Sequence, residues 1–254
     1  MAKEVQVKQE QALSAEVADL SNWGAPEVLG QDILISKILI MQPSSEMVAD
    51  GKANLGEFRD SVVGTKLGDQ VTPIEVIPFH LQKYWDIHTE EGGQYQWTRS
   101  EPLIENPVAK GYNDNLPWQD VENGKPIKRV RRMNFFVLLP SEVAKGDSLP
   151  YVLSFRSTSY TEGKKVYSQM YMRNLRANLP PAGYTFKISS VKQKNEKGQS
   201  WFVPTVELGR RATSVEITEA FNWYKTVSSN SGIKVDDSDV AAKDTVSSDG
   251  AGDY

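Results

Sequence analysis

The chain has 254 residues, with 29 Lys and Arg, 33 Asp and Glu, and a formal net charge of −4 at pH 7. It contains no cysteine, which excludes disulfides, thiolate metal sites and cysteine nucleophiles. Its start does not resemble a signal peptide and its longest apolar run is too short to span a bilayer, so we expect a cytoplasmic protein without a membrane partner.

The charge is distributed unevenly along the chain. Residues 1–124 hold nine basic and twenty acidic residues, a net charge of −11, whereas residues 125–211 hold seventeen basic and five acidic ones, a net charge of +12. The last 23 residues carry −4. A cationic middle in an acidic protein favours a polyanionic partner. The alternative is that the acidic first half neutralises the cationic block by packing against it.

The first predicted elements follow a flexible segment over residues 1–30. Aliphatic residues over 32–42 predict a buried strand, and a Ser-Ser-Glu sequence after it is typical of a helix start. Residues 71–88 predict a long strand, which Pro73 and Pro78 should confine to a sheet edge or divide in two. Residues 89–128 lack periodicity and are rich in Gly, Pro and Asn, so we expect a long connection, either functional or a surface insertion anchored by its aromatics.

The rest of the chain is more regular. We predict strands over 129–139 and 151–156, a helix over 162–177, a hairpin of strands 184–194 and 200–207, and a helix over 215–227. A helix between the third and fourth of five strands matches the oligonucleotide-binding barrel, the OB-fold. The predicted fold is therefore mainly β with a few helices: one OB-like five-stranded barrel domain over 31–230, an N-terminal extension, and a disordered acidic tail over 231–254.

No catalytic motif is present in the sequence. His80 and His88 are its two histidines, and eight residues along one strand separate them too far to share a metal. No HExxH, GxSxG or GxxxxGK[ST] pattern occurs. We therefore expect no enzymatic activity, no cofactor and no metal. A nuclease that holds its metal with Asp and Glu alone stays open as a third hypothesis.

The cationic block combines positive charge with flat side chains. Binding of single-stranded nucleic acid needs cations for the phosphates and aromatic rings for the unstacked bases. The cations that we predict to contact phosphates are Arg129, Arg131, Arg132, Arg156, Lys165, Arg176, Lys192, Lys194 and Lys197. The aromatics predicted to stack on bases are Tyr151, Phe155, Tyr184 and Trp201, and others, among them Tyr160, Tyr167 and Tyr171, lie between the cations. The alternative for each residue is a solvated face or a place in the core.

Strand and helix geometry divides these cations between faces. On the strand over 129–139, Lys128 and Arg132 should face one way, and Arg129 and Arg131 the other. Only one of the two pairs can therefore line a given groove. On the helix over 162–177, Lys165 and Arg176 share a polar face, and the aliphatic side chains belong to the buried one.

The C-terminal tail is acidic and ends in an aromatic residue. Its predicted partner-binding residues are Asp236, Asp237, Asp239, Asp244, Asp249, Asp253 and Tyr254. Together with the strand order and the basic block, this tail resembles those of single-stranded DNA-binding proteins of bacteria and short-tailed phages. The resemblance implies a tail that occupies the DNA groove when DNA is absent. It also implies that DNA releases the tail to recruit replication proteins such as a polymerase or helicase.

A second resemblance lies in the first half of the chain. The segment KILIMQPSSE from Lys37, continued by DGKA from Asp50 and GEFRDS from Gly56, is similar to phage proteins from replication gene neighbourhoods. We therefore expect a phage single-stranded DNA-binding protein for replication or recombination in the bacterial host cytoplasm, with self-association left open. The alternative is a non-enzymatic phage structural or assembly protein whose acidic and cationic parts make complementary subunit contacts.

Overall fold

A computed structural model of the chain describes residues 34–104, 113–173, 176–229 and 234–235. The strands in these ranges are β1 (Leu34–Ile40), β2 (Phe58–Asp60), β3 (Lys66–Gly68), β4 (Ile74–Glu91), β5 (Gln94–Pro102), β6 (Gln119–Glu122), β7 (Lys125–Leu138), β8 (Tyr151–Arg156), β9 (Tyr184–Lys194), β10 (Ser200–Arg211) and β11 (Lys234–Val235). The helices are α2 (Glu46–Ala49), α3 (Pro140–Val143), α4 (Tyr160–Ser168) and α6 (Ser214–Ser229), with the short helical segments η2 (Ser157–Ser159), η3 (Gln169–Arg173) and η4 (Pro181–Gly183).

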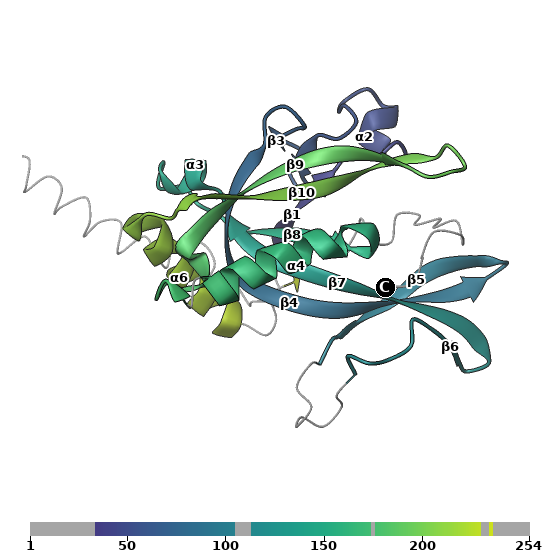
Figure 1. The fold of residues 1–254 in the computed structure, drawn as a ribbon. Coiled ribbons are helices and arrows are strands. Elements are labelled where there is room, and N and C mark those ends of the chain that lie inside the picture. The colour runs from purple at the N-terminus through teal and green to yellow at the C-terminus, as the bar shows by residue number, and fades with distance from the viewer. Residues whose placement is uncertain (1–33, 105–112, 174–175, 230–233, 236–254) are drawn as a thin grey trace, which may run out of the picture.

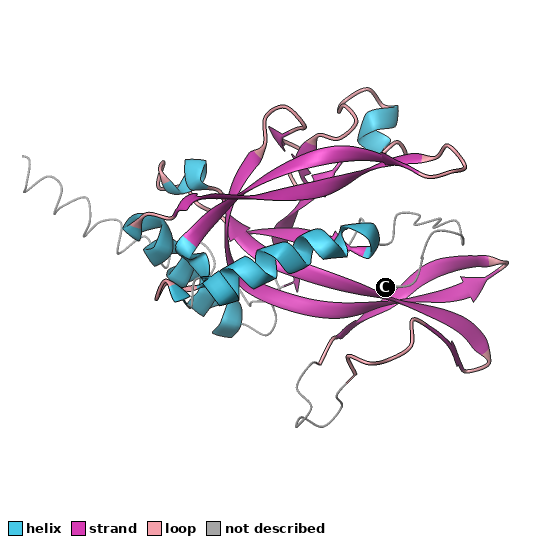
Figure 2. Cartoon of the chain, in the orientation of Figure 1, coloured by secondary structure: helices cyan, strands magenta, loops and turns pink. Residues whose placement is uncertain are grey.

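All of these strands belong to one mixed sheet (Figures 1 and 2). The order along the sheet is β10-β9-β4-β7-β8-β1-β2-β3, and β11, β5 and β6 pair with β1, β4 and β7. The pairs are antiparallel except that β1 runs parallel to β8 and to β11. The predicted mainly β fold is confirmed, whereas the predicted OB barrel is corrected, because the sheet of the described residues stays open.

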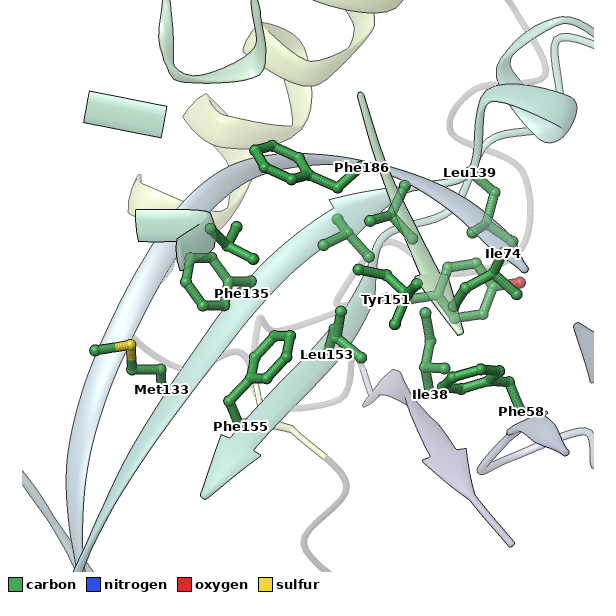
Figure 3. Close-up of a cluster of buried hydrophobic side chains, with 14 of the residues drawn as sticks. Ile38, Phe58, Ile74, Met133, Phe135, Leu139, Tyr151, Leu153, Phe155 and Phe186 are labelled. Carbon is green, nitrogen blue, oxygen red and sulfur yellow. The ribbon is translucent and has the colours of Figure 1, made fainter. Parts of the chain in front are cut away.

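The open sheet is bent around helix α4. Figure 1 shows the β9–β10 hairpin above α4 and strands β4 and β7 below it. Between these layers Met133, Phe135 and Phe155 pack against Val166 of α4 and Phe186 of β9 (Figure 3). Burial of such side chains contributes roughly 1.5–3 kcal/mol each, so this cluster holds the helix to the sheet.

A glycine lets α4 approach the sheet closely. A Cβ atom at Gly163 would lie 2.9 Å from Cβ of Phe155 and 3.2 Å from Sδ of Met133. Any side chain here would therefore push the helix outward. Val166 and Met170 are buried beside Gly163, as the amphipathic pattern of this segment predicts. The helix begins at Tyr160, slightly earlier than predicted, and passes into the π-helical segment η3.

Helix α6 packs on the opposite face of the sheet. Ala220 and Val227 of α6 lie in a second cluster with Ile77, Phe136 and Leu138. Both faces of strands β4 and β7 are thus covered in this region. For this reason the sequences of these strands are nearly continuous apolar runs and do not alternate between apolar and polar residues.

A side-chain amide, not a strand pair, links the two ends of the sheet. The Gln42 side chain donates from Nε2 to the carbonyl oxygen of Phe202 at 2.8 Å and accepts from the Phe202 N–H at 2.9 Å. Ser190 Oγ also donates to the carbonyl oxygen of Gly56. The Gln42 bonds satisfy backbone groups of β10, and the Ser190 bond satisfies the carbonyl of Gly56, without extending the ladder, so the sheet curls but does not close.

The two prolines have only part of the effect that we predicted. Strand β4 begins just after Pro73 and continues through Pro78, because residues 74–76 pair with β9 and residues 77–89 with β7. The register shifts between Pro78 and His80. A bulge at this point accommodates a residue that has no N–H to donate. The prediction of a divided strand is therefore wrong, whereas the prediction of an edge holds around Pro78, because within the described strands residues 77–83 pair on the β7 side only.

The predicted long connection over 89–128 is also corrected. Its described part contains β5, β6 and the start of β7, which form hairpins at Gly92-Gly93 and Asn123-Gly124. All four turn residues have positive φ, the conformation that two-residue hairpin turns require. These strands and the halves of β4 and β7 that pair with them are called the arm here.

The remaining elements agree with the sequence in different degrees. Strands β8 and β9 match the prediction residue for residue, and α6 differs by one or two residues at its ends. Lys234–Val235 pairs with β1, which corrects the prediction of disorder at this point. The predicted flexible segment over 1–30 and the tail over 236–254 lie outside the described residues. In the described ranges, no helix is both long and apolar enough to cross a membrane.

Candidate nucleic-acid interface

Of the three arginines predicted on β7, Arg132 is buried in the sheet. Its side chain is 2 % exposed and forms an ion pair with Asp86 at 3.2 Å. Nη2 of Arg132 also donates to Oγ of Ser100 at 3.0 Å, and that hydroxyl donates to Asp86. A guanidinium held in this way in the interior is out of reach of a phosphate. The prediction of a phosphate contact for Arg132 is therefore corrected.

The other two arginines of β7 bind groups of the arm. Nη1 of Arg129 donates to Oδ2 of Asp120 at 2.9 Å and to the carbonyl oxygen of Pro117 at 3.1 Å, and its side chain is only 11 % exposed. Arg131 is exposed, but its guanidinium stacks over the Trp85 ring at 5.0 Å. These two cations thus stabilise the arm itself. Arg132 lies on the opposite face of β7, as the alternation of side chains along a strand requires.

In the part of the chain that the structure describes, four of the seventeen cations of the block are paired with acids of the first half of the chain. Within the described residues, ion pairs join its cations to acids of residues 1–124 at Arg132–Asp86, Arg129–Asp120, Lys125–Glu91 and Arg210–Glu75. The alternative explanation of the block, packing against the acidic first half, therefore holds for this group. The charge that the block presents to a ligand is smaller than +12.

Two of the four predicted stacking residues belong to the core. Phe155 is fully buried and packs edge-on against Phe135, with ring centroids 5.7 Å apart. Tyr151 is 7 % exposed, and its hydroxyl donates to Oε1 of Glu142 at 3.0 Å. Burial, reinforced by the bond to Glu142, raises the pKa of Tyr151. Neither ring can take a base, because both faces of their strand are covered.

The β9–β10 hairpin carries a cationic tip. Lys192, Lys194 and Lys197 are all exposed, and Trp201 is half-buried on the paired strand. Figure 1 shows the end of this hairpin projecting beyond the body of the protein. The lysines predicted here are thus accessible, whereas Trp201 offers only part of its ring.

The strongest combination of rings and cations lies on the surface of α4. Tyr160, Lys164, Tyr167 and Tyr171 follow one another at spacings of four, three and four residues, which places them on one face of a helix. Lys164 Nζ lies 5.5 Å from the Tyr160 ring centroid, and the Tyr167 and Tyr171 rings are 4.9 Å apart. Tyr160 and Tyr167 also pack against the core cluster that contains Val166, so this face borders the buried one.

Neighbouring strands add to this surface. Lys83 of β4 places Nζ 4.1 Å from the centroid of the Tyr167 ring. Arg173 of η3 stacks its guanidinium over Tyr184, the first residue of β9, at 5.3 Å. The surface is called the α4 band here, and its members are Tyr160, Tyr167, Tyr171, Tyr184, Lys83, Lys164 and Arg173.

The α4 band combines exposure with a fixed position. Tyr171 is 43 % exposed, Lys164 and Arg173 are exposed, and the other members are half-buried. Glu162 anchors the helix to the edge of the sheet, because Oε2 accepts the Val206 N–H of β10 at 3.1 Å. Burial, with the nearby phenols of Tyr167 and Tyr224, raises the pKa of Tyr171, so its ring stays uncharged at neutral pH.

The α4 band contains one residue of the predicted site, Tyr184. Lys165 is exposed on the same helix but pairs with Glu162, Arg176 is exposed just beyond η3, and Arg156 is half-buried before η2. The sequence prediction missed Lys83, Lys164 and Arg173, and it did not select Tyr160, Tyr167 and Tyr171. The helical spacing of these tyrosines was the signal that could have identified them.

The remaining sequence predictions concern the acidic tail, a metal site and the histidines. The acidic tail residues from Asp236 to Tyr254 lie outside the described residues. Over the ranges that the structure describes, no three His, Asp or Glu side chains gather closely enough to hold a metal ion. His80 contacts the Phe136 and Tyr224 rings at 5.4 and 5.7 Å, and burial lowers its pKa.

The fold and the α4 band define a mainly β protein with an open mixed sheet and an aromatic, cationic helix surface. The sequence model of the Pam3 phage gp34-like protein family matches residues 7–232. The chain therefore belongs to this family, which supports a phage origin. Searches of the curated proteins and of the solved structures returned no match.

Proposed function

We propose that this phage protein binds single-stranded DNA without sequence preference, through the α4 band, during replication or recombination of the phage genome. The observation that supports the proposal is the band itself, in which three cations each lie over a tyrosine ring and a fourth ring, Tyr171, adjoins Tyr167. The proposed role is to coat and protect the strand, without catalysis.

The chemistry of the band suits a flexible polyanion with flat bases. A base stacked on an aromatic ring contributes about 1–3 kcal/mol, whereas an exposed cation–π pair contributes about 0.5–1 kcal/mol. A base can therefore displace the Lys83 ammonium from the face of the Tyr167 ring and stack there, and the ammonium can then contact a phosphate. Stacking uses the face of a base, which all bases share, so it gives little sequence preference.

Two other regions have secondary roles in this proposal. Lys192, Lys194 and Lys197 at the exposed hairpin tip would contact phosphates farther along the strand. The acidic tail from Asp236 to Tyr254 would compete with DNA for the cations and recruit replication proteins when DNA releases it. A tail that competes by charge should do so most strongly at low salt.

The test is fluorescence anisotropy of a labelled oligo(dT), titrated with the full chain at several salt concentrations. Binding through phosphates predicts that log affinity falls with log salt, at about 0.7 per phosphate neutralised. Tyr167→Ala should weaken binding about 5- to 150-fold, the equivalent of one lost stack. Tyr167→Phe keeps the ring and should bind like the natural protein.

The arm offers a matched control for this experiment. Tyr95 also lies beneath a lysine, with Nζ of Lys128 3.9 Å from its centroid, but it belongs to the arm and not to the band. Tyr95→Ala should therefore leave affinity unchanged. The proposal fails if the natural protein does not bind at low salt, or if the Tyr167→Ala and Tyr95→Ala variants lose affinity equally.

The alternative role in phage structure or assembly gives a different result in the same samples. It requires regular oligomers by light scattering and no response to oligonucleotide. The ion pairs within the chain, such as Arg132–Asp86, weaken its premise, because they use charges that subunit contacts would need. A nuclease would instead cleave the oligonucleotide when magnesium or manganese is added.

A further inference from the structure

An exposed apolar patch lies beside the α4 band and shares only Tyr171 with it. It contains Tyr171 and Met172 of η3, 43 % and 64 % exposed, and Phe221 and Tyr224 of α6, 54 % and 41 % exposed. Large side chains that gather on a surface in this way mark an interaction site more often than chance exposure does.

The patch is continuous with the band. Tyr171 belongs to both, since its ring centroid lies 4.9 Å from that of Tyr167 and the phenol of Tyr224 is near enough to contribute to raising its pKa. Tyr224 in turn contacts the ring of His80 on β4 at 5.7 Å. The π-helical segment η3 lies at this junction, and such segments occur often at functional sites.

The sheet leaves an open edge where the two helices meet. Strand β4 pairs with β9 up to Val76 and with β5 from Tyr84 onward. Between these points, within the described strands, β4 has a neighbour only on the β7 side. His80 and Lys83 lie in this interval, and they contact Tyr224 and Tyr167. A ligand can therefore pass from one helix to the other across this edge.

The charges of α6 favour a polyanion on its outer face. Lys225 Nζ stacks over the Phe221 ring at 4.2 Å, which repeats the pairing seen along the band. The two acids of α6 bind groups of the protein, because Glu216 pairs with Arg210 and Glu219 accepts from Ser148 and Trp223. The exposed face thus offers two rings and a cation, as a nucleic-acid strand requires.

We infer that the bound single strand continues from the α4 band across the open edge of β4 and onto α6. Tyr224 and Phe221 take the next bases, and Lys225 contacts a phosphate. This inference rests on the proposed function and deepens it, because it gives the path and the extent of the binding site. In this path α4 and α6 contact the same single-stranded DNA, although they pack on opposite faces of the sheet.

The experiment is a length series of labelled oligo(dT), from about 4 to 30 nucleotides, titrated with the full chain and with Phe221→Ala. Phe221 is half-exposed and outside the buried clusters, so its removal should leave the fold intact. On long oligonucleotides the variant should bind about 5- to 150-fold more weakly, the loss of one stack. On the shortest oligonucleotide that still binds, Phe221→Ala and the natural protein should have equal affinities. The apparent site size of the variant should be smaller than that of the natural protein.

Val215→Ala is the matched control. Val215 is 65 % exposed in the first turn of the same helix but outside the patch, and its variant should bind like the natural protein at every length. Equal affinities of Phe221→Ala and Val215→Ala at all lengths, with Tyr167→Ala weakened at all lengths, would overturn the path and leave the proposed function standing. No binding by the natural protein would overturn both. A fall in molar mass of Phe221→Ala by light scattering would assign the patch to a second copy instead.

Discussion

The anchor of helix α6 gives a prediction with a defined magnitude. Thr213 and Glu216 form a reciprocal cap, in which the Thr213 N–H donates to Oε2 of Glu216 at 2.7 Å and the Glu216 N–H donates to Oγ1 of Thr213 at 3.3 Å. Nη1 and Nη2 of Arg210 donate to Oε2 and Oε1 of Glu216, at 2.9 and 2.6 Å respectively. The Glu216 side chain is only 7 % exposed.

These contacts make the stability of the protein depend on pH. The hydrogen bonds from Arg210 lower the pKa of Glu216 from 4.5 to about 2, against the opposing effect of burial. A shift of this size corresponds to about 3.4 kcal/mol at 1.36 kcal/mol for each pKa unit. Since Arg210 is 46 % exposed, solvent screens the pair, and about 2 kcal/mol is the expected contribution. The folded-state pKa is depressed, so this stability is complete above pH 4.5 and is lost as the pH falls toward 2.

Urea unfolding of the Glu216→Gln variant at pH 7 and at pH 2.5 measures this contribution. At pH 7 the variant should be less stable by about 2 kcal/mol, and at pH 2.5 the difference should be largely gone. Glu196→Gln, at an exposed hairpin turn, is the control and should match the natural protein at both pH values. A variant as stable as the natural protein at pH 7, or an equal deficit at both pH values, would refute the reasoning.

Two further substitutions test the packing. Gly163→Ala gains helix propensity of about 1 kcal/mol, but its Cβ would meet Phe155 and Met133, so we expect a net loss of up to about 2 kcal/mol in urea unfolding; a more stable variant would contradict the close packing of α4. Asp86→Ala leaves the buried Arg132 without its carboxylate and should cost about 3–5 kcal/mol, whereas a loss below 1 kcal/mol would show that water reaches this pair.

Local patterns predicted several elements well, and non-local pairing explains the failures. Strands β8 and β9 match their predicted bounds because alternation and turn residues act over a few neighbours. The hairpins of the arm had local signals too, in Gly92-Gly93 and Asn123-Gly124, which the search for periodicity passed over. The OB barrel failed because strand order depends on pairs such as β1 with β8, far apart in sequence.

In the candidate site, too, local patterns predicted some features and non-local packing decided the others. Alternation along β7 put Arg132 and Arg131 on different faces, but only the position of Asp86 on β4 made Arg132 a buried partner. Tyr151 and Phe155 fit a stacking pattern by composition, yet covering layers on both faces of β8 make them core. The exposure of a ring is a property of what packs over it, and a single sequence does not state this.

The sequence by itself determined that this protein is mainly β, that cations and aromatics share its middle, and that acids precede and follow them. These properties depend on composition and on short spacings along the chain. The tertiary structure decided which cations meet a carboxylate and which meet a ring. Ion pairs remove Arg129 and Arg132 from the surface charge, whereas the tyrosines of the band stay half-buried or exposed beside α4. Both outcomes depend on neighbours that only folding brings together.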